Sequence, residues 1–285
     1  MLTQLDKARA FRALHERRGA FIIPNPYDAG TARLLAHLGF EALATTSAGA
    51  AFTAGKPDHG VTRDDMLAHV AAIAAAVDLP VSGDLENGYG DSPEEAAQTI
   101  VLAAAAGLVG GSIEDSRNES DDSANRRGEP IFEIGLATDR IYAAAEAAQS
   151  LSFPFTLTAR AENYLHGRND LADTIKRLQA YQEAGANVLY APGLTRKEDI
   201  EAVVSSVDLP VNVLGGLGDP PFDFATLSAL GVKRISVGGA LARAALGAFL
   251  RAAHEMRDNG AFTFAKDAAS GRELNIIFEG YEQRH

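Results

Sequence analysis

The chain has 285 residues, no cysteine, and 26 basic against 38 acidic residues, which gives a formal net charge of −12. The missing cysteine excludes disulfides, zinc–thiolate sites and thiol nucleophiles, and the negative charge disfavours binding to nucleic acid or to an anionic membrane. The apolar runs are too short to cross a bilayer and the N-terminus lacks a signal-peptide core, so we expect a cytoplasmic protein that acts on a small molecule.

A recurring junction predicts the architecture. An Ala-rich amphipathic stretch runs into a glycine and is followed by a short aliphatic stretch, most clearly at Gly39, Gly107, Gly185 and Gly231. Glycine ends a helix at low cost because it adopts the left-handed cap conformation, and the chain then turns into a buried strand. Each junction therefore predicts a helix followed by a strand.

In chain order, these signals predict eight strands separated by helices. Such alternation gives right-handed parallel βαβ units, and eight units in a chain of this length favour a single (β/α)8 TIM-barrel domain over residues 1–285. A doubly wound open sheet is the alternative. The predicted strands are Phe21–Pro24, Ala42–Thr46, Val81–Leu85, Val109–Ile113, Phe155–Ala159, Val188–Ala191, Val211–Leu214 and Arg234–Val237.

The loop expected after the second strand begins with small residues, Thr45 to Ala50. Their backbone N–H groups can approach an anion closely. The same loop then brings an acid, Asp58, and a histidine, His59, into reach of the strand ends. A solvated loop position is the more common role for such a histidine.

Three carboxylates follow the third and fourth strands. Asp84 and Glu86 alternate at the end of the third, so both should face the barrel mouth, and Glu114 or Asp115 ends the fourth. Converging carboxylates raise one another's pKa unless a positive charge lies among them. Oxygen-only ligands favour Mg²⁺ or Mn²⁺ over zinc, so we predict a divalent metal site here; the alternative is that these acids cap the following helices.

The stretch from Ser116 to Pro130 is long and charged, which suits a lid over the site. The fifth strand ends next to Arg160, whose planar guanidinium group can bind a substrate carboxylate or stabilise an enolate oxygen. An ion pair with a neighbouring carboxylate is an equally good reading of this arginine.

The C-terminal segment exceeds what a closed barrel needs. A long helix is expected over Gly239–Met256, and apolar residues recur at Leu274 and Ile276 to Phe278. Apolar residues left over after barrel closure are often buried against another subunit, so we expect a homo-oligomer. A tail packed across the chain's own barrel end is the alternative.

Five separated motifs follow one another in the chain: Ser47-Ala48-Gly49, Lys56-Pro57-Asp58, Gly83-Asp84-Leu85-Glu86-Asn87-Gly88, Ile113-Glu114-Asp115 and Thr158-Ala159-Arg160. In order and spacing they resemble the isocitrate lyase/phosphoenolpyruvate mutase superfamily over nearly the whole chain. The resemblance implies a Mg²⁺-dependent enzyme that makes or breaks a C–C or C–P bond of a small 2-oxo or 2-hydroxy carboxylate through an enolpyruvate-like species.

The resemblance also implies roles for single residues. Asp84 would hold the metal directly, and Glu86 and Glu114 would reach it directly or through water. The catalytic candidates are Asp58, Arg160 and Glu114, of which Asp58 would assist metal, substrate or proton transfer and Arg160 would grip the substrate. The backbone of Ser47, Ala48 and Gly49 would seat the substrate carboxylate. Members form dimers of dimers that exchange C-terminal helices, here residues 240–285.

Departures from the pattern narrow the expected activity. Isocitrate and methylisocitrate lyases carry Lys-Lys/Arg-Cys-Gly-His after the fourth strand, with the cysteine as acid, whereas this chain reads Ser116-Arg117-Asn118-Glu119-Ser120. Their glutamate after the sixth strand is replaced within Tyr190 to Gly193. We therefore expect a phosphonomutase-like or oxaloacetate-decarboxylase-like enzyme, with Asn118 or Asn125 as the lid asparagine and Asn212 at the mouth. A class II hydroxy-acid aldolase and a non-catalytic metabolite-binding barrel are the alternatives.

Overall fold

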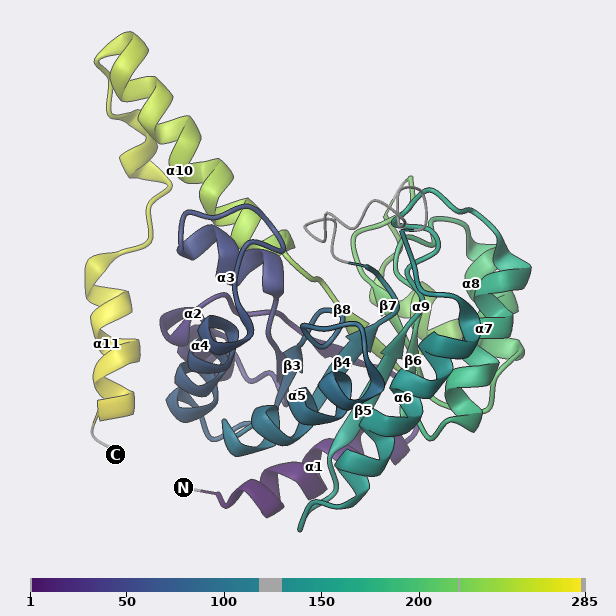
Figure 1. Cartoon of the computed structure of the whole chain (residues 1–285). Coiled ribbons are helices and arrows are strands. Elements are labelled where there is room, and N and C mark those ends of the chain that lie inside the picture. The colour runs from purple at the N-terminus through teal and green to yellow at the C-terminus, as the bar shows by residue number, and fades with distance from the viewer. Residues whose placement is uncertain (1, 118–129, 220, 283–285) are drawn as a thin grey trace.

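The computed structural model describes residues 2–117, 130–219 and 221–282. Eight parallel strands form one sheet in which consecutive strands pair from β2 to β8 and β8 pairs with β1. At the remaining seam the Ala44 N–H donates to the Pro24 carbonyl at 3.1 Å, so the sheet curls into a nearly closed barrel (Figure 1). The predicted TIM barrel is confirmed. The strands are β1 (Phe21–Ile23), β2 (Leu43–Ala44), β3 (Val81–Asp84), β4 (Gly110–Glu114), β5 (Thr156–Arg160), β6 (Val188–Tyr190), β7 (Val211–Leu214) and β8 (Arg234–Ser236).

Helices alternate with the strands and cover the outside of the barrel. The four predicted junction glycines all adopt a positive φ between 85° and 99°, as helix ends of this kind require. At the other ends, capping boxes start helices at Thr62 and Ser92. The helices around the barrel are α1 (Gln4–Glu16), α2 (Ala29–His37), α3 (Ser47–Thr53), α4 (Arg63–Ala76), α5 (Pro93–Ala105), α6 (Ile134–Gln149), α7 (Leu171–Glu183), α8 (Lys197–Ser205) and α9 (Phe224–Ala229).

One predicted loop is partly helical. The residues after β2 enter α3 at once, because the Thr46 side chain caps it by accepting from the Gly49 N–H. The alanines that follow are strong helix formers. The prediction of a loop over these small residues was therefore wrong, and the motif Ser47 to Gly49 forms the first turn of a helix.

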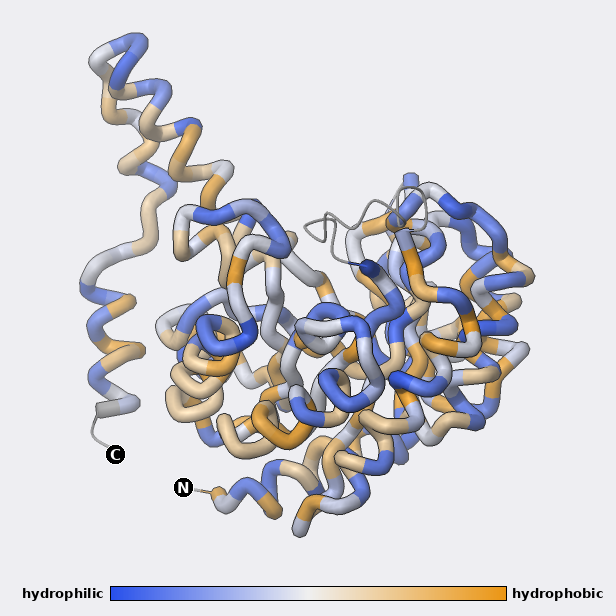
Figure 2. Tube along the Cα trace, in the orientation of Figure 1, coloured by the Kyte–Doolittle hydropathy of each residue, from blue (hydrophilic) through white to orange (hydrophobic). Residues whose placement is uncertain are grey.

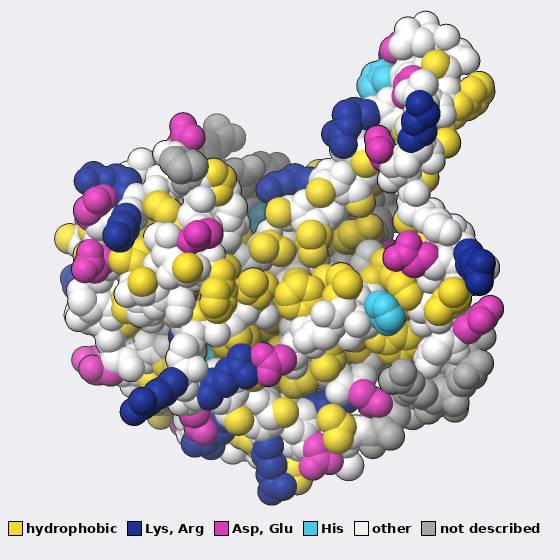
Figure 3. All heavy atoms as spheres, turned by 180° about the vertical axis from the view of Figure 1, so that it is seen from behind, with side chains coloured by type: hydrophobic (Ala, Val, Ile, Leu, Met, Phe, Trp, Pro, Cys, Tyr) yellow, Lys and Arg dark blue, Asp and Glu magenta, His cyan; other side chains and the backbone are white. Residues whose placement is uncertain are grey.

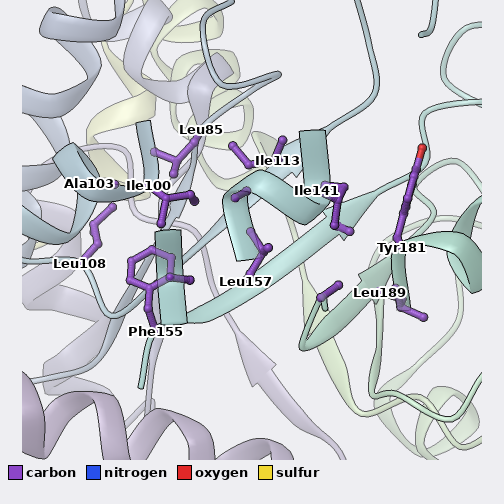
Figure 4. Close-up of a cluster of buried hydrophobic side chains, with 14 of the residues drawn as sticks. Leu85, Ile100, Ala103, Leu108, Ile113, Ile141, Phe155, Leu157, Tyr181 and Leu189 are labelled. Carbon is purple, nitrogen blue, oxygen red and sulfur yellow. The ribbon is translucent and has the colours of Figure 1, made fainter. Parts of the chain in front are cut away.

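The hydrophobic core fills the layer between the strands and the helices. Leu85, Ile113 and Leu157 are fully buried beside β3, β4 and β5, and they lie in one cluster with Ile100 of α5 and Ile141 of α6 (Figure 4). This packing fixes the three strands whose ends carry Asp84, Glu114 and Arg160. Burial of each large aliphatic side chain contributes about 1.5–3 kcal/mol.

The N-terminal helix α1 closes the lower end of the barrel. Its Phe11 is fully buried, and a side chain in place of Gly110 would come within 2.8 Å of the Phe11 ring. The helix lies at the end of the barrel opposite α3 (Figure 1). Ligands can therefore reach the barrel interior from the upper end, where the carboxyl ends of the strands lie.

The C-terminal segment is helical, as predicted, and extends away from the barrel. Helix α10 (Ala240–Asn259) begins beside α3 and projects outward, and after a 3₁₀ turn (Thr263–Lys266) helix α11 (Gly271–Glu282) returns beside α2 (Figure 1). Hydrophobic residues run along the projecting helix (Figure 2) and across the face below it (Figure 3). Among the described helices, none is long and apolar enough to cross a membrane.

Candidate active site

Asp84 is the last residue of β3 and is held from two sides. Its Oδ1 accepts from Arg160 Nη1 at 2.8 Å. Its Oδ2 accepts from the Ser47 N–H at 2.9 Å and from the Ser47 hydroxyl at 2.8 Å. The β2–α3 junction and β5 thus fix the orientation of one carboxylate at the centre of the rim.

Arg160, the last residue of β5, gathers three carboxylates around one charge. Its Nη1 lies 2.8 Å from Asp84 and 2.9 Å from Glu114, and its Nε lies 2.9 Å from Glu162. Register explains part of this, because Glu114 and Arg160 are direct partners across β4 and β5. Burial alone would lower the pKa of Arg160, but Glu114, Glu162 and Asp84 raise it. The positive charge that converging acids require is supplied here by the protein itself.

Glu86 lies beyond the end of β3 and reaches the rim through a turn. Its φ of 48° is left-handed, so strand alternation does not set its direction, although it lies near Asp84 and Glu114 as predicted. Burial raises the pKa of Glu86. Its Oε2 lies 3.3 Å from His59 Nδ1, while its buried Oε1 has no hydrogen-bond partner among the residues that the structure describes.

Arg140 of α6 holds the backbone that follows Glu86 in place. It is buried, and its guanidinium group donates to the carbonyls of Asn87, Gly90 and Ser92, which follow Glu86. Five N–H donors in a planar fork suit this task. The position of Glu86 therefore depends on a helix that follows β4.

Glu114, and not Asp115, joins the rim. Glu114 contacts Arg160 and accepts from the Ser116 hydroxyl. Asp115 points into the protein, where it accepts from Tyr181 Oη at 2.6 Å, Arg177 Nη1 at 3.0 Å and the Glu162 N–H at 2.8 Å. Asp115 therefore anchors the fold behind the site.

A cavity of about 190 Å³ opens beside these residues. Its wall includes Ser47, Ala48, Asp58, Asp84 and Arg160, which the sequence predicted as site residues. Since a liquid water occupies about 30 Å³, the space suits a small acid. A larger hollow of about 920 Å³ lies at the opposite end, next to α1, and none of the rim carboxylates lines it.

Two predicted substrate-binding residues lie away from the cavity wall. Asn212 is buried in the barrel, where its Oδ1 accepts from Arg234 Nε at 2.8 Å and its Nδ2 donates to Ser236 Oγ at 3.0 Å. The Gly49 N–H donates to the Thr46 hydroxyl and is already used as a helix cap. Asn118 and Asn125, the predicted lid asparagines, lie outside the described residues, as does most of the predicted lid.

His59 and Glu162 are site residues that the sequence did not predict to be functional: His59 was interpreted as a solvated loop residue, and Glu162 was not singled out. His59 follows Asp58 with a left-handed φ of 60°, and its contact with Glu86 raises the pKa of His59 to about 9. Glu162 lies two residues after Arg160 in the sequence. An acid at this spacing after the fifth strand is the sequence feature that could have identified it as a site residue. Burial raises the pKa of Glu162, while Arg160 opposes the rise.

The donor chemistry of the rim fits a hard divalent cation. All candidate ligands are carboxylate oxygens, and within the described part of the chain Glu86 Oε1 is buried without a hydrogen-bond partner, which is costly unless something binds it. Among the described residues, no three acidic or histidine side chains already form a ligand set, since Arg160 lies between Asp84 and Glu114. A cation at this rim would share the carboxylates of Asp84 and Glu114 with Arg160.

Comparison with known proteins places the chain among related enzymes. The profile of the phosphoenolpyruvate phosphomutase family matches residues 11–257. A crystal structure from Burkholderia cenocepacia, of a protein assigned as a lyase or mutase, is 61% identical and superposes with a TM-score of 0.92 over 97% of both chains. A Mycobacterium tuberculosis protein is 31% identical over 87% of this chain and 89% of its own. The oxaloacetate decarboxylase of Pseudomonas fluorescens is 27% identical over 94% of this chain and 90% of its own.

Proposed function

Because the chain belongs to the phosphoenolpyruvate phosphomutase family, within the isocitrate lyase/phosphoenolpyruvate mutase superfamily, we propose that it is a Mg²⁺-dependent lyase or mutase. It acts on a small 2-oxo or 2-hydroxy carboxylate and makes or breaks a C–C or C–P bond through an enolpyruvate-like species. The observation that carries the proposal is the cluster of Asp84, Glu114 and Arg160 on the ends of three adjacent strands beside a cavity of about 190 Å³.

Each rim residue has a task in this proposal. Asp84, Glu86 and Glu114 would hold Mg²⁺, or Mn²⁺, which when bound stabilises negative charge on a substrate oxygen. Arg160 binds the substrate carboxylate or the enolate oxygen with its planar donor fork. Ser47 orients Asp84 through two hydrogen bonds. Asp58, which lines the cavity, is the candidate for moving a proton.

The absence of cysteine from the sequence supports one branch of the family over another. Isocitrate-type cleavage needs an acid to protonate the departing carbanion, and the lyases use a thiol for it. Decarboxylation of a 2-oxo diacid breaks a C–C bond, releases CO₂ and leaves an enolate that solvent can protonate. Cleavage or rearrangement of a phosphonate likewise needs no thiol. An oxaloacetate-decarboxylase-like or phosphonomutase-like reaction is therefore favoured, in keeping with the likeness to a decarboxylase.

The proposal includes an assembly of identical chains. The outward side of α10 exposes Leu246, Phe249 and Leu250, with 42%, 68% and 56% of their surface accessible. An apolar face of this kind in a protein without a membrane-crossing helix among those described suits burial against another copy. We propose a dimer of dimers in which residues 240–285 are exchanged between subunits.

The test is a metal-supplemented screen that follows pyruvate release and, by phosphorus NMR, the interconversion of phosphoenolpyruvate and phosphonopyruvate, which releases no pyruvate. Oxaloacetate, phosphonopyruvate, phosphoenolpyruvate and substituted malates are offered with Mg²⁺, with Mn²⁺ and with a chelator. We expect turnover of at least one of them that the chelator abolishes. Aldehyde plus pyruvate is included, because condensation of that pair would favour the aldolase alternative. Mg²⁺-dependent binding of oxalate without turnover of any acid would instead indicate a metabolite-binding barrel.

Asp84→Ala identifies the residue responsible. It should abolish metal-dependent turnover and leave the barrel folded, because a rim carboxylate contributes little to the hydrophobic core. Asp64→Ala, at an exposed position in the first turn of α4, is the matched control and should keep full activity. An unchanged rate in Asp84→Ala would reject Asp84 as a metal ligand.

A further inference from the structure

Two arginines line the cavity, and they differ in how far their charges are compensated. Arg160 contacts three carboxylates within 2.9 Å, so its charge is more than matched. Arg243, in the first turn of α10, is exposed, and it forms no ion pair or side-chain hydrogen bond with any part of the chain that the structure describes. Among the described residues of the cavity wall, Arg243 is the cation whose charge no acidic side chain already compensates.

The two arginines lie on different sides of the barrel mouth. Arg160 ends β5, whereas α10 follows β8, three strands further around the barrel. The start of α10 packs against α3, which follows β2 (Figure 1), and the buried Ala242 lies beside Gly49. Arg243 is therefore held on the β8 and β2 side of the cavity, whereas Arg160 lies at the end of β5.

An uncompensated cation in the cavity wall favours the binding of an anionic ligand, because acidic side chains lie close by. The cavity wall also carries Asp58 and Asp84, and the whole chain has a net charge of −12. A ligand with a single carboxylate needs one cationic contact, which the Arg160 side of the site can supply together with a bound metal. A ligand with a second anionic group would place that group against acids unless it reached Arg243.

We propose that Arg243 binds a second anionic group at the far end of the substrate, so that the site selects small acids with two anionic ends over those with one. This inference rests on the proposed function for the first end of the substrate and adds the residue that recognises the second end. The second group is a carboxylate or a phosphonate, both of which a guanidinium fork binds through paired N–H donors. The cavity volume of about 190 Å³ suits an acid of a few carbon atoms.

Three ligands separate the two ends of the site. Oxalate probes only the metal-side end. Malate and 2-hydroxybutyrate have the same four-carbon 2-hydroxy acid skeleton and differ in that malate ends in a carboxylate and 2-hydroxybutyrate in a methyl group. Titration calorimetry with Mg²⁺ measures the three affinities in the wild-type protein, in Arg243→Gln and in Arg243→Lys. Arg251→Gln, at another exposed arginine of α10, is the matched control.

We expect the wild-type protein to bind malate more tightly than 2-hydroxybutyrate. Arg243→Gln should weaken malate binding about tenfold or more, the usual scale for a lost charge-assisted pair, and should leave oxalate and 2-hydroxybutyrate within about twofold. Arg243→Lys should bind malate more tightly than Arg243→Gln but less tightly than the wild-type protein. Lysine restores the positive charge but not the paired N–H donors of the guanidinium group. Arg251→Gln should change none of the affinities.

Two results would overturn the inference: equal wild-type affinity for malate and 2-hydroxybutyrate, or an Arg243→Gln effect that is equal for all three ligands or absent for malate. Loss of oxalate binding in the wild-type protein would count against the proposed function instead, and the comparison of malate with 2-hydroxybutyrate would still decide the role of Arg243. If none of the acids binds, both proposals fail.

Discussion

Arg160 is the side chain on which the carboxylate rim depends, because one guanidinium group compensates Asp84, Glu114 and Glu162. Arg160→Gln removes the charge and keeps an amide donor. We expect it to lower the free energy of unfolding by about 3 kcal/mol or more, since loss of one partner leaves buried carboxylates uncompensated. Urea unfolding followed by circular dichroism measures the difference from the wild-type protein.

The exposed pair of Arg12 and Glu16 gives the control for this experiment. Both side chains are more than half accessible, so Arg12→Gln should cost less than about 1 kcal/mol. Mg²⁺ should restore part of the stability that Arg160→Gln loses, because a cation among the acids replaces the missing charge. If Mg²⁺ stabilises neither the wild-type protein nor the variant, the rim does not bind the ion.

Sequence position predicted which residues meet, but not how their side chains are paired. Asp84, Glu114 and Arg160 converge because the carboxyl ends of adjacent parallel strands share one edge, which periodicity already implies. Sequence offered an ion pair with a neighbouring carboxylate as one of two readings of Arg160, but it could not show that this one guanidinium group compensates three acids. Nor could it show that Asn212 turns inward to Arg234, since that contact joins residues brought together only by barrel closure.

At the scale of elements, helix α1, which closes the lower end of the barrel, contains a buried histidine. His15 of α1 is 8% exposed, its Nδ1–H donates to the Phe11 carbonyl at 2.9 Å, and its Nε2 has no partner among the described residues. Burial lowers the pKa of His15 to about 3, and nearby Arg234 contributes in the same direction. The folded protein therefore keeps this imidazole neutral in mild acid.

The neutral imidazole makes stability depend on pH. An exposed histidine has a pKa of about 6.5, so between pH 6.5 and 3 the unfolded chain binds a proton that the folded chain does not. The free energy of unfolding contributed by His15 should then fall as pH falls, by about 1.4 kcal/mol between pH 7.5 and 5.5. Urea unfolding at these two pH values should show a smaller loss for His15→Gln than for the wild-type protein.

His37→Gln, at an exposed position in α2, is the control for this pH dependence. It should lose as much stability as the wild-type protein between the two pH values. A His15→Gln variant whose loss equals that of the wild-type protein would show that the imidazole is protonated, or reaches solvent, in the folded state.

Helices and strands were more predictable than the turns between them. Four glycines with positive φ ended helices where the sequence placed them, because that backbone conformation is costly for other residues. The helix after β2 was missed, because its short alanine-rich stretch carries no amphipathic period and depends on the Thr46 cap. The left-handed turn at Glu86 was equally hidden, since it is held by Arg140 from a distant helix.

At the scale of the whole molecule, the C-terminal helices have little to pack against within one chain. Tyr281 of α11 donates to the Arg33 carbonyl of α2 at 3.0 Å, and the first turn of α10 contacts α3. Between these points α10 projects from the barrel with apolar residues exposed (Figures 1 and 3). Exchange of residues 240–285 between subunits stays a prediction. If the exchange occurs, the assembly of subunits should depend on the exposed apolar face of α10.

Phe249→Asp tests that dependence. With 68% of its surface exposed in one chain, Phe249 contributes little to the stability of the barrel, whereas an aspartate buried against another subunit would be strongly unfavourable. We expect multi-angle light scattering after gel filtration to show a four-chain species for the wild-type protein and a smaller species for Phe249→Asp, with the same urea midpoint for the barrel. Val101→Asp, at an exposed apolar position on α5, should keep the wild-type assembly. An unchanged assembly in Phe249→Asp would show that this face of α10 is not a subunit interface.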